Sequence, residues 1–185
     1  MEAFTASVLL VAIAEIGDKT QMLSLYLAAR YRRPGTIVAG IAVSTLANHA
    51  LAGALGAWVA TLVSPAVLRW MLGVAFLAFA AWALVADSFS EPAGLQRSRL
   101  GVFLITVVAL FAAEMGDKTQ LATVALAAKY GSVVIVVLGT TLGMMLANAP
   151  VVYAGERLAK RLPIVWARRI AALLFALTGV VTLVG

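Results

Sequence analysis

Two short acidic segments hold the residues of this chain whose types and spacing could do chemistry. The segments Glu15–Gln21 (EIGDKTQ) and Glu114–Gln120 (EMGDKTQ) are identical at six of seven positions. In each, the glutamate and the aspartate are three residues apart, so on a helix both carboxylates would lie on one face. Carboxylate oxygens are preferred ligands of Mg²⁺, Ca²⁺ and Mn²⁺. The pattern therefore predicts a site for a hard divalent cation.

The acidic side chains of both segments are expected to act together. Four carboxylates and two ammonium groups give a net charge of −2, which one divalent ion would neutralise. Repulsion among the carboxylates would favour protons in the place of the metal, so metal binding would release protons. The expected metal ligands are Glu15, Asp18, Glu114 and Asp117. The expected supporting polar residues are Lys19, Thr20, Gln21, Asn48, Lys118, Thr119, Gln120 and Asn148.

The lysines and glycines of the segments leave alternatives open. Lys19 is four residues after Glu15, and a simple ion pair within the helix is the favoured interpretation. It could instead be a tethered cation that keeps the carboxylates ionised in the empty site, and the same holds for Lys118. Gly17 and Gly116 could unwind the helix and free backbone carbonyls, or allow close contact between helices.

Polar residues outside the two segments are weaker candidates. Asn48 and Asn148 recur in matching Leu-Ala-Asn triplets, and interhelical hydrogen bonding and cation contact are equally favoured for them. His49 is the only histidine of the chain, and packing between helices is favoured over a role as ligand. Met144 and Met145 could offer a thioether, but helix packing is the default interpretation.

The remaining sequence places these acids inside a membrane. Of the 185 residues, 63% are apolar and 12% are charged, whereas soluble domains have about 45–50% and about 25%. A membrane-spanning helix needs about 20 residues. In such long apolar runs, only a helix satisfies the hydrogen bonds of its own backbone within lipid. The acidic segments fall about 16 Å from either end of their spans, a depth at which ionisable groups are by default functional. The expected spans are roughly Phe4–Ala29, Gly35–Val63, Ala66–Ala86, Leu100–Ala128, Ser132–Gly155 and Ile164–Val184.

The order of the segments predicts an internal repeat. Residues 1–86 and 100–185 each hold three spans, with the acidic segment in the first span. Because three is odd, the second half would enter the membrane from the opposite side, which is typical of secondary transporters. The expected fold is an all-α membrane protein with six transmembrane helices, arranged as two inverted three-helix repeats in a single domain (1–185). Further matches are Leu27–Tyr31 with Leu126–Tyr130, Gly40 with Gly139, and Leu46–Asn48 with Leu146–Asn148 after a slip of one residue.

Basic residues predict the orientation. Ten lysines and arginines follow the first, third and fifth spans, whereas the other side holds only Arg69 and Lys129. Cytoplasmic loops are enriched in Lys and Arg, so the linker 87–99 is expected in the cytoplasm. The protein is expected in the inner (plasma) membrane of the cell, with both termini outside the cytoplasm. The N-terminal region carries Glu2 and no basic segment, so a cleavable signal peptide is not expected.

The two motifs resemble those of a known family. The chain is similar to the widespread E-x-G-D-[KR]-[TS] membrane proteins, which include the Golgi manganese/calcium transporters and bacterial manganese exporters. The resemblance extends over essentially the whole chain and shows no departure within either motif. It implies a cation/H⁺ antiporter with Mn²⁺ and Ca²⁺ as usual substrates, although preferred metal and direction vary in the family. It also implies a cation site from the motif acids Glu15, Asp18, Glu114 and Asp117, with Lys19, Thr20, Lys118 and Thr119 completing the motifs.

The expected function is export of Mn²⁺ across the lipid bilayer in exchange for H⁺. Ca²⁺/H⁺ antiport by the same site is the alternative. A proton-relay subunit of a membrane complex would not need two identical sites, and a carrier for organic cations would need a larger apolar cavity. An enzyme is not expected, since the Glu and Lys beside Asp18 and Asp117 do not fit an aspartic dyad. No cofactor and no nucleic-acid partner is expected, and assembly into a homo-oligomer stays open.

Overall fold

The chain folds into helices throughout the part that the computed structural model describes, residues 1–86, 101–155 and 163–185. The predicted linker 87–99 and several of the predicted cytoplasmic basic residues lie outside these ranges. Those basic residues are Arg97, Arg99, Arg157, Lys160 and Arg161. The described helices are α1 (Glu2–Ala14), α2 (Lys19–Tyr31), α3 (Pro34–Leu62), α4 (Pro65–Ala83), α5 (Val102–Glu114), α6 (Lys118–Tyr130), α7 (Val133–Ala154) and α9 (Ile164–Val184).

Four of these helices, α3, α4, α7 and α9, are long and apolar enough to cross a membrane, and α1 and α5 are shorter apolar helices. Each of the four long helices lies within a few residues of a predicted span. The chain is therefore an all-helical, multi-pass membrane protein, as its composition predicts.

The two spans that carry the acidic segments are interrupted, which is one of the alternatives that their glycines left open. Phe4–Ala29 is divided into α1 and α2, and Leu100–Ala128 into α5 and α6, each a helix of 13 residues. Both interruptions fall within the acidic segment. The physical reason is local, because each segment contains a glycine at positive φ followed by an aspartate that begins a new helix.

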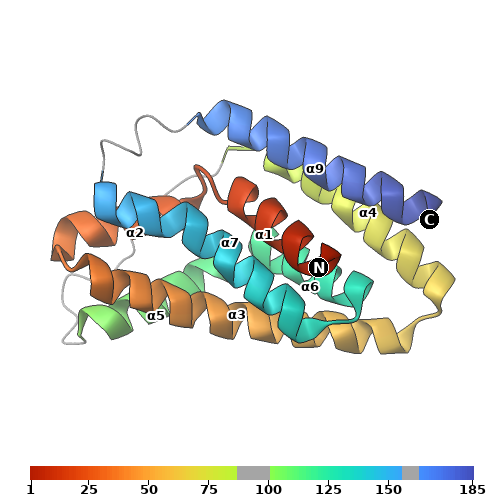
Figure 1. Ribbon diagram of the computed structural model, residues 1–185, viewed down its shortest axis with the longest axis horizontal. Helices are drawn as coiled ribbons and strands as arrows, with labels where there is room; N and C mark the ends of the chain where they lie inside the picture. Colours follow the sequence, from red (N-terminus) through yellow and green to blue (C-terminus); the bar gives the residue numbers. More distant parts are fainter. Residues whose placement is uncertain (87–100, 156–162) are drawn as a thin grey trace.

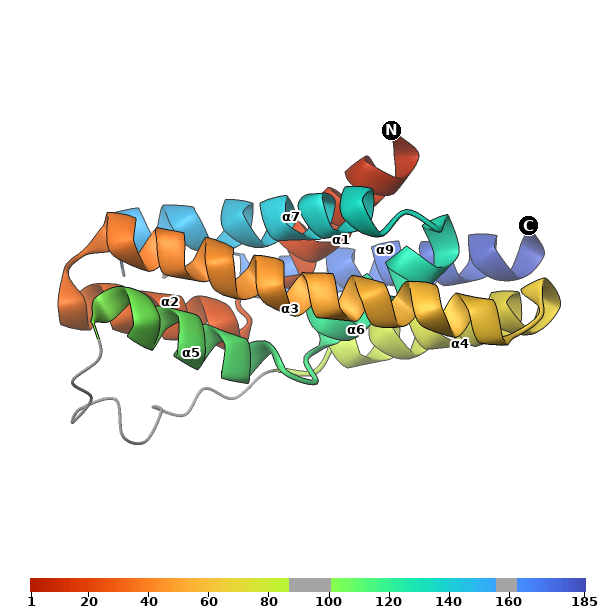
Figure 2. The same ribbon diagram turned by 90° about the horizontal axis from the view of Figure 1, so that it is seen from below.

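The helices run along one bundle, and the two interrupted pairs break near the middle of its length (Figures 1 and 2). Both ends of the chain lie toward the same end of the bundle, where the turns from α3 to α4 and from α6 to α7 are also found (Figure 1). The turn from α2 to α3 lies at the opposite end (Figure 1). The acidic segments are thus held at the centre of the molecule.

Small residues bring the helices of the two halves together. A Cβ atom on Gly40 of α3 would lie 2.7 Å from Cβ of Thr106 of α5, and one on Gly139 of α7 would lie 2.8 Å from Cβ of Ser7 of α1. Gly40 and Gly139 match in sequence, so each packs the same way against the opposite half. Close approach at small residues is a usual basis of helix packing in membranes.

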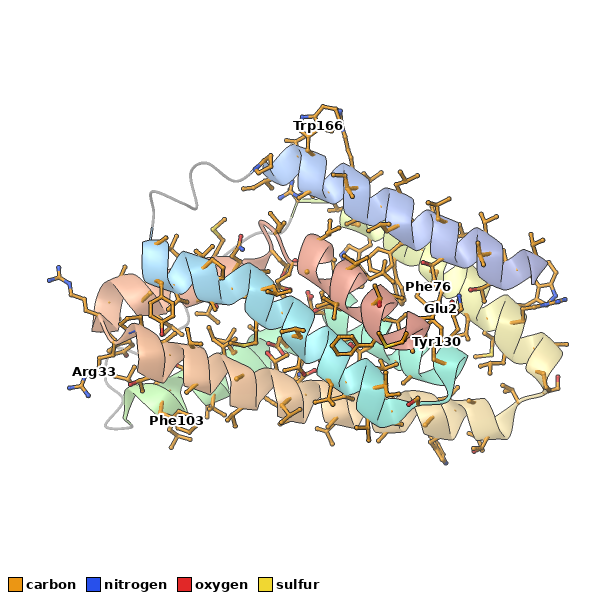
Figure 3. All side chains as sticks on the ribbon, viewed as in Figure 1. Glu2, Arg33, Phe76, Phe103, Tyr130 and Trp166 are labelled. Carbon is orange, nitrogen blue, oxygen red and sulfur yellow. The ribbon has the colours of Figure 1, made fainter. Side chains whose placement is uncertain are left out.

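The remaining pair, α4 and α9, forms one side of the bundle through aromatic contacts. The rings of Phe76, Phe79 and Phe175 lie 5.9 to 6.5 Å apart. Near one end, Tyr130 donates to Glu2 Oε1 at 3.4 Å, which ties α6 to the start of α1 (Figure 3). The pair α4 and α9 thus covers one side of the motif-bearing helices.

Candidate metal site at the two helix breaks

Each acidic segment forms a helix break with the same backbone path. Gly17 has φ +79° and Gly116 has φ +74°, a region that other residues enter only with strain. The following aspartates, Asp18 and Asp117, are extended and begin α2 and α6. Unwinding of the helix, one of the two interpretations of these glycines, is therefore seen at both positions.

The aspartates cap the new helices. Asp18 Oδ2 accepts from the backbone N–H of Thr20 at 3.4 Å and from its hydroxyl at 3.3 Å. Asp117 Oδ2 accepts the same two bonds from Thr119 at 3.3 and 3.2 Å. On an unbroken helix Thr20 would point away from the acids, but the break turns it toward Asp18. Each aspartate thereby satisfies a backbone donor in the first turn of its helix.

The glutamine side chains bond to the backbone at the helix breaks. Gln21 Oε1 accepts from the N–H of Gly17 at 2.9 Å, and Gln120 Oε1 accepts from the N–H of Gly116 at 2.7 Å. Gln21 also donates to the carbonyl of Ala147 at 2.9 Å. The motif glutamines therefore satisfy backbone donors that the loss of helix exposes, rather than facing the acids.

The lysines pair across the two segments. Lys19 Nζ lies 2.9 Å from Asp117 Oδ1, and Lys118 forms the other pair with Asp18. The favoured expectation, an ion pair of Lys19 with Glu15 within one helix, is wrong, because the break removes the helical turn that would bring the two side chains together. The crossed pairs place the two segments against each other at the centre of the bundle.

The two glutamates are fully buried beside α3 and α7. Glu15 Oε1 accepts from Asn148 Nδ2 at 3.3 Å, and Glu114 Oε1 accepts from the hydroxyl of Thr45 at 2.9 Å. The second carboxyl oxygen of each glutamate is buried without a hydrogen-bond partner among the described residues. Each acid thus keeps one oxygen available to a ligand.

The two asparagines do not occupy corresponding places. Asn148 contacts Glu15, whereas Asn48 Nδ2 lies 3.7 Å from the sulfur of Met115. Sequence reasoning did not single out Thr45 or Met115. The signal for Thr45 was present, since it lies four residues before His49 on a face of an otherwise apolar span.

The acidic side chains lie close enough to interact electrostatically, but they do not form a complete metal site by themselves. Glu15 interacts electrostatically with Asp18, Asp117 and Glu114. Across residues 1–86, 101–155 and 163–185, however, no three histidine, aspartate or glutamate side chains are gathered closely enough to hold a metal ion by themselves. In this arrangement the two lysines form ion pairs with the two aspartates, and neutral side chains donate hydrogen bonds to the two glutamates.

Comparison with known proteins agrees with this chemistry. The family model described as "Divalent cation/proton antiporter GDT1" matches residues 3–91 and 102–185. A protein of Vibrio cholerae serotype O1 named "Putative manganese exporter" is 48% identical over 98% of this chain and 90% of its own length. GDT1-like proteins of Synechocystis sp. and of Oryza sativa subsp. indica are 29% and 28% identical over 98% and 94% of this chain, and over 97% and 70% of their own lengths. No solved structure matches the chain.

The family model covers both broken helices and nearly all of the chain around them. The chain belongs to the GDT1 family of divalent cation/proton antiporters, and it is a transporter, not an enzyme.

Proposed function

We propose that this protein exports Mn²⁺ in exchange for H⁺, with the metal ion held between the two helix breaks. The observation that carries the proposal is the pair of crossed contacts, Lys19 with Asp117 and Lys118 with Asp18. Each lysine reaches from one break to the aspartate of the other. The ammonium groups therefore stand where a cation would bridge the two halves.

In the proposed cycle the lysines act as tethered cations of the metal-free site. The four motif carboxylates and two lysines carry a net charge of −2, which a divalent ion compensates. Entry of the metal moves the lysines off Asp18 and Asp117 and frees both carboxylates as ligands. When the metal leaves, protons and the lysines restore the balance, which couples the two fluxes.

We also propose that the chain consists of two inverted repeats with a defined orientation in the membrane. Matched contacts support two inverted repeats, residues 1–86 and 100–185, because the equivalent glycines of α3 and α7 pack against the first helix of the opposite half. The family match in two segments agrees with this division. The excess of basic residues after the odd-numbered spans supports an inner-membrane orientation with both termini outside the cytoplasm.

Ca²⁺/H⁺ exchange by the same site is the second candidate. The motif carboxylates and the free glutamate oxygens suit the oxygen-only coordination of Ca²⁺. The name of the Vibrio relative favours manganese. Measuring uptake of each ion under one protocol separates the two candidates.

The test is metal flux in inside-out vesicles or proteoliposomes with a pH-sensitive dye inside. Wild type should take up Mn²⁺ and release protons in the opposite direction, and Asp18→Asn and Asp117→Asn should each abolish both fluxes. Glu2→Gln is the matched control, since this acid is exposed at the end of the bundle. Metal flux without counter-moving protons, or full transport by Asp18→Asn, would contradict the proposal.

A further inference from the structure

The surroundings of Glu15 include a sulfur atom. Asn148 Nδ2 lies 3.3 Å from Glu15 Oε1 and 3.3 Å from Met144 Sδ. All three side chains are fully buried. Glu15 Oε2 and Asn148 Oδ1 have no hydrogen-bond partner among the described residues. A carboxylate oxygen and a thioether thus lie beside the same amide group, and Glu15 and Asn148 each keep one buried oxygen without a partner there.

The corresponding place beside Glu114 follows from the register of the two halves. The register that matches Glu15 with Glu114 also matches Gly40 with Gly139, and both glycines make the same contact with the opposite half. In this register Thr45 corresponds to Met144, and His49 corresponds to Asn148. The slipped alignment that pairs the two asparagines therefore does not describe their positions in space.

The contacts of α3 agree with this register. Thr45 donates to Glu114 Oε1 at 2.9 Å, so its face of α3 is turned toward the acid. His49 is one helical turn further on the same face, as Asn148 is one turn beyond Met144. His49 is 0% exposed, and neither ring nitrogen has a hydrogen-bond partner in the described part of the chain. Packing accounts for the burial of His49 but not for two unsatisfied nitrogens.

We infer that Met144 and His49 are further metal ligands, one beside each glutamate, and that they select a transition metal ion of the Mn²⁺ class over Ca²⁺. The inference rests on the proposed function, since it assumes that the ion binds between the two breaks. Ca²⁺ takes oxygen ligands, whereas transition metals accept imidazole and thioether donors. Among the described residues the acids and His49 are not gathered into a metal site without the ion, so these neutral donors would join the acids as the ion binds.

The first test measures selectivity in the purified protein in lipid nanodiscs. The dissociation constants of Mn²⁺ and Ca²⁺ are compared for wild type, Met144→Leu and His49→Asn, where asparagine is the residue at the equivalent position of the other half. Each variant should shift the ratio of the two constants toward Ca²⁺ by about tenfold, the scale on which metal-site partners act. The control is Met145→Leu, because Met145 packs with the apolar cluster around Leu23, Leu27 and Ile41.

A second measurement needs no stable variant. Pulsed electron paramagnetic resonance of Mn²⁺ bound to the wild-type protein should show coupling to an imidazole nitrogen, because His49 is the only histidine of the chain. The coupling should vanish in His49→Asn. A purely structural histidine would give no such signal.

The outcomes separate this inference from the proposed function. An unchanged Mn²⁺/Ca²⁺ ratio in Met144→Leu removes that residue from the site. Absence of nitrogen coupling in wild type removes His49, and in both cases exchange of Mn²⁺ for H⁺ would stand. A wild-type protein that moves neither ion would overturn the proposed function, and the inference with it.

Discussion

The two crossed ion pairs are related in sequence but differ in their surroundings. The side chain of Lys118 is 4% exposed, whereas that of Lys19 is 31% exposed, although both partner aspartates are buried. Removing one partner of a buried pair leaves an uncompensated charge, and the cost is much smaller where water reaches the site. The two lysines should therefore contribute differently to the stability of the metal-free protein.

Lys118→Gln should lower the free energy of unfolding by about 3–5 kcal/mol, because it leaves Asp18 buried without its cation. Lys19→Gln should cost less, since solvent screens the exposed side of its pair. Denaturation of both variants in the same detergent provides the comparison. The double variant Asp18→Asn/Lys118→Gln should recover most of the lost stability, and a larger loss for Lys19→Gln than for Lys118→Gln would contradict the assignment.

At the scale of helices, the two breaks share a backbone path but not a neighbour. A Cβ on Gly17 would lie 2.5 Å from Cγ2 of Ile164 on α9, while a Cβ on Gly116 would meet no described residue within 4 Å. Gly17 thus serves both alternatives raised by the sequence, unwinding and close contact, whereas Gly116 serves only unwinding. The first break is covered by α9, whereas none of the described residues covers the second at Gly116.

Gly116→Ala should destabilise the protein by about 1–2 kcal/mol, the cost of positive φ for a residue with a Cβ atom. Gly17→Ala carries the same strain together with the clash against Ile164, so its melting temperature should fall further. The added Ile164→Ala substitution should recover the difference between the two variants. Equal melting temperatures for Gly17→Ala and Gly116→Ala would show that α9 does not press on the first break.

For the whole molecule, the ends of the chain provide the test of orientation. Both ends lie toward the same end of the bundle (Figure 1), which requires an even number of membrane crossings. The positive-inside rule predicts that this end faces the outside of the cell. The orientation determines which face of the metal site meets the cytoplasm, and hence which direction counts as export.

Alkaline phosphatase, active only outside the cytoplasm, should be active when fused to either terminus of the chain. The same enzyme inserted in the predicted cytoplasmic linker 87–99 should be inactive, and green fluorescent protein should show the reverse pattern. Activity at one terminus alone would contradict an even number of crossings. Inactivity at both, with an active linker fusion, would reverse the orientation.

Much of the fold is encoded locally and can be predicted from the sequence. Apolar runs of sufficient length predict membrane helices, and the observed α9 has the predicted bounds, Ile164–Val184. The sequence did not decide whether the motif-bearing spans are continuous. A glycine in an apolar run fits both a helix and a break, and hydropathy does not distinguish the two.

The sequence by itself determined which residues carry charge into the membrane, that they come in two copies, and that they belong to an antiporter family. Only the tertiary structure decided their partners. Lys19 pairs with Asp117 because the break redirects each segment toward the opposite one. The contacts of Gly40 and Gly139 decide the register in which His49 corresponds to Asn148. Contacts between residues about a hundred positions apart depend on how the helices pack, and neither spacing along one helix nor a local alignment contains that information.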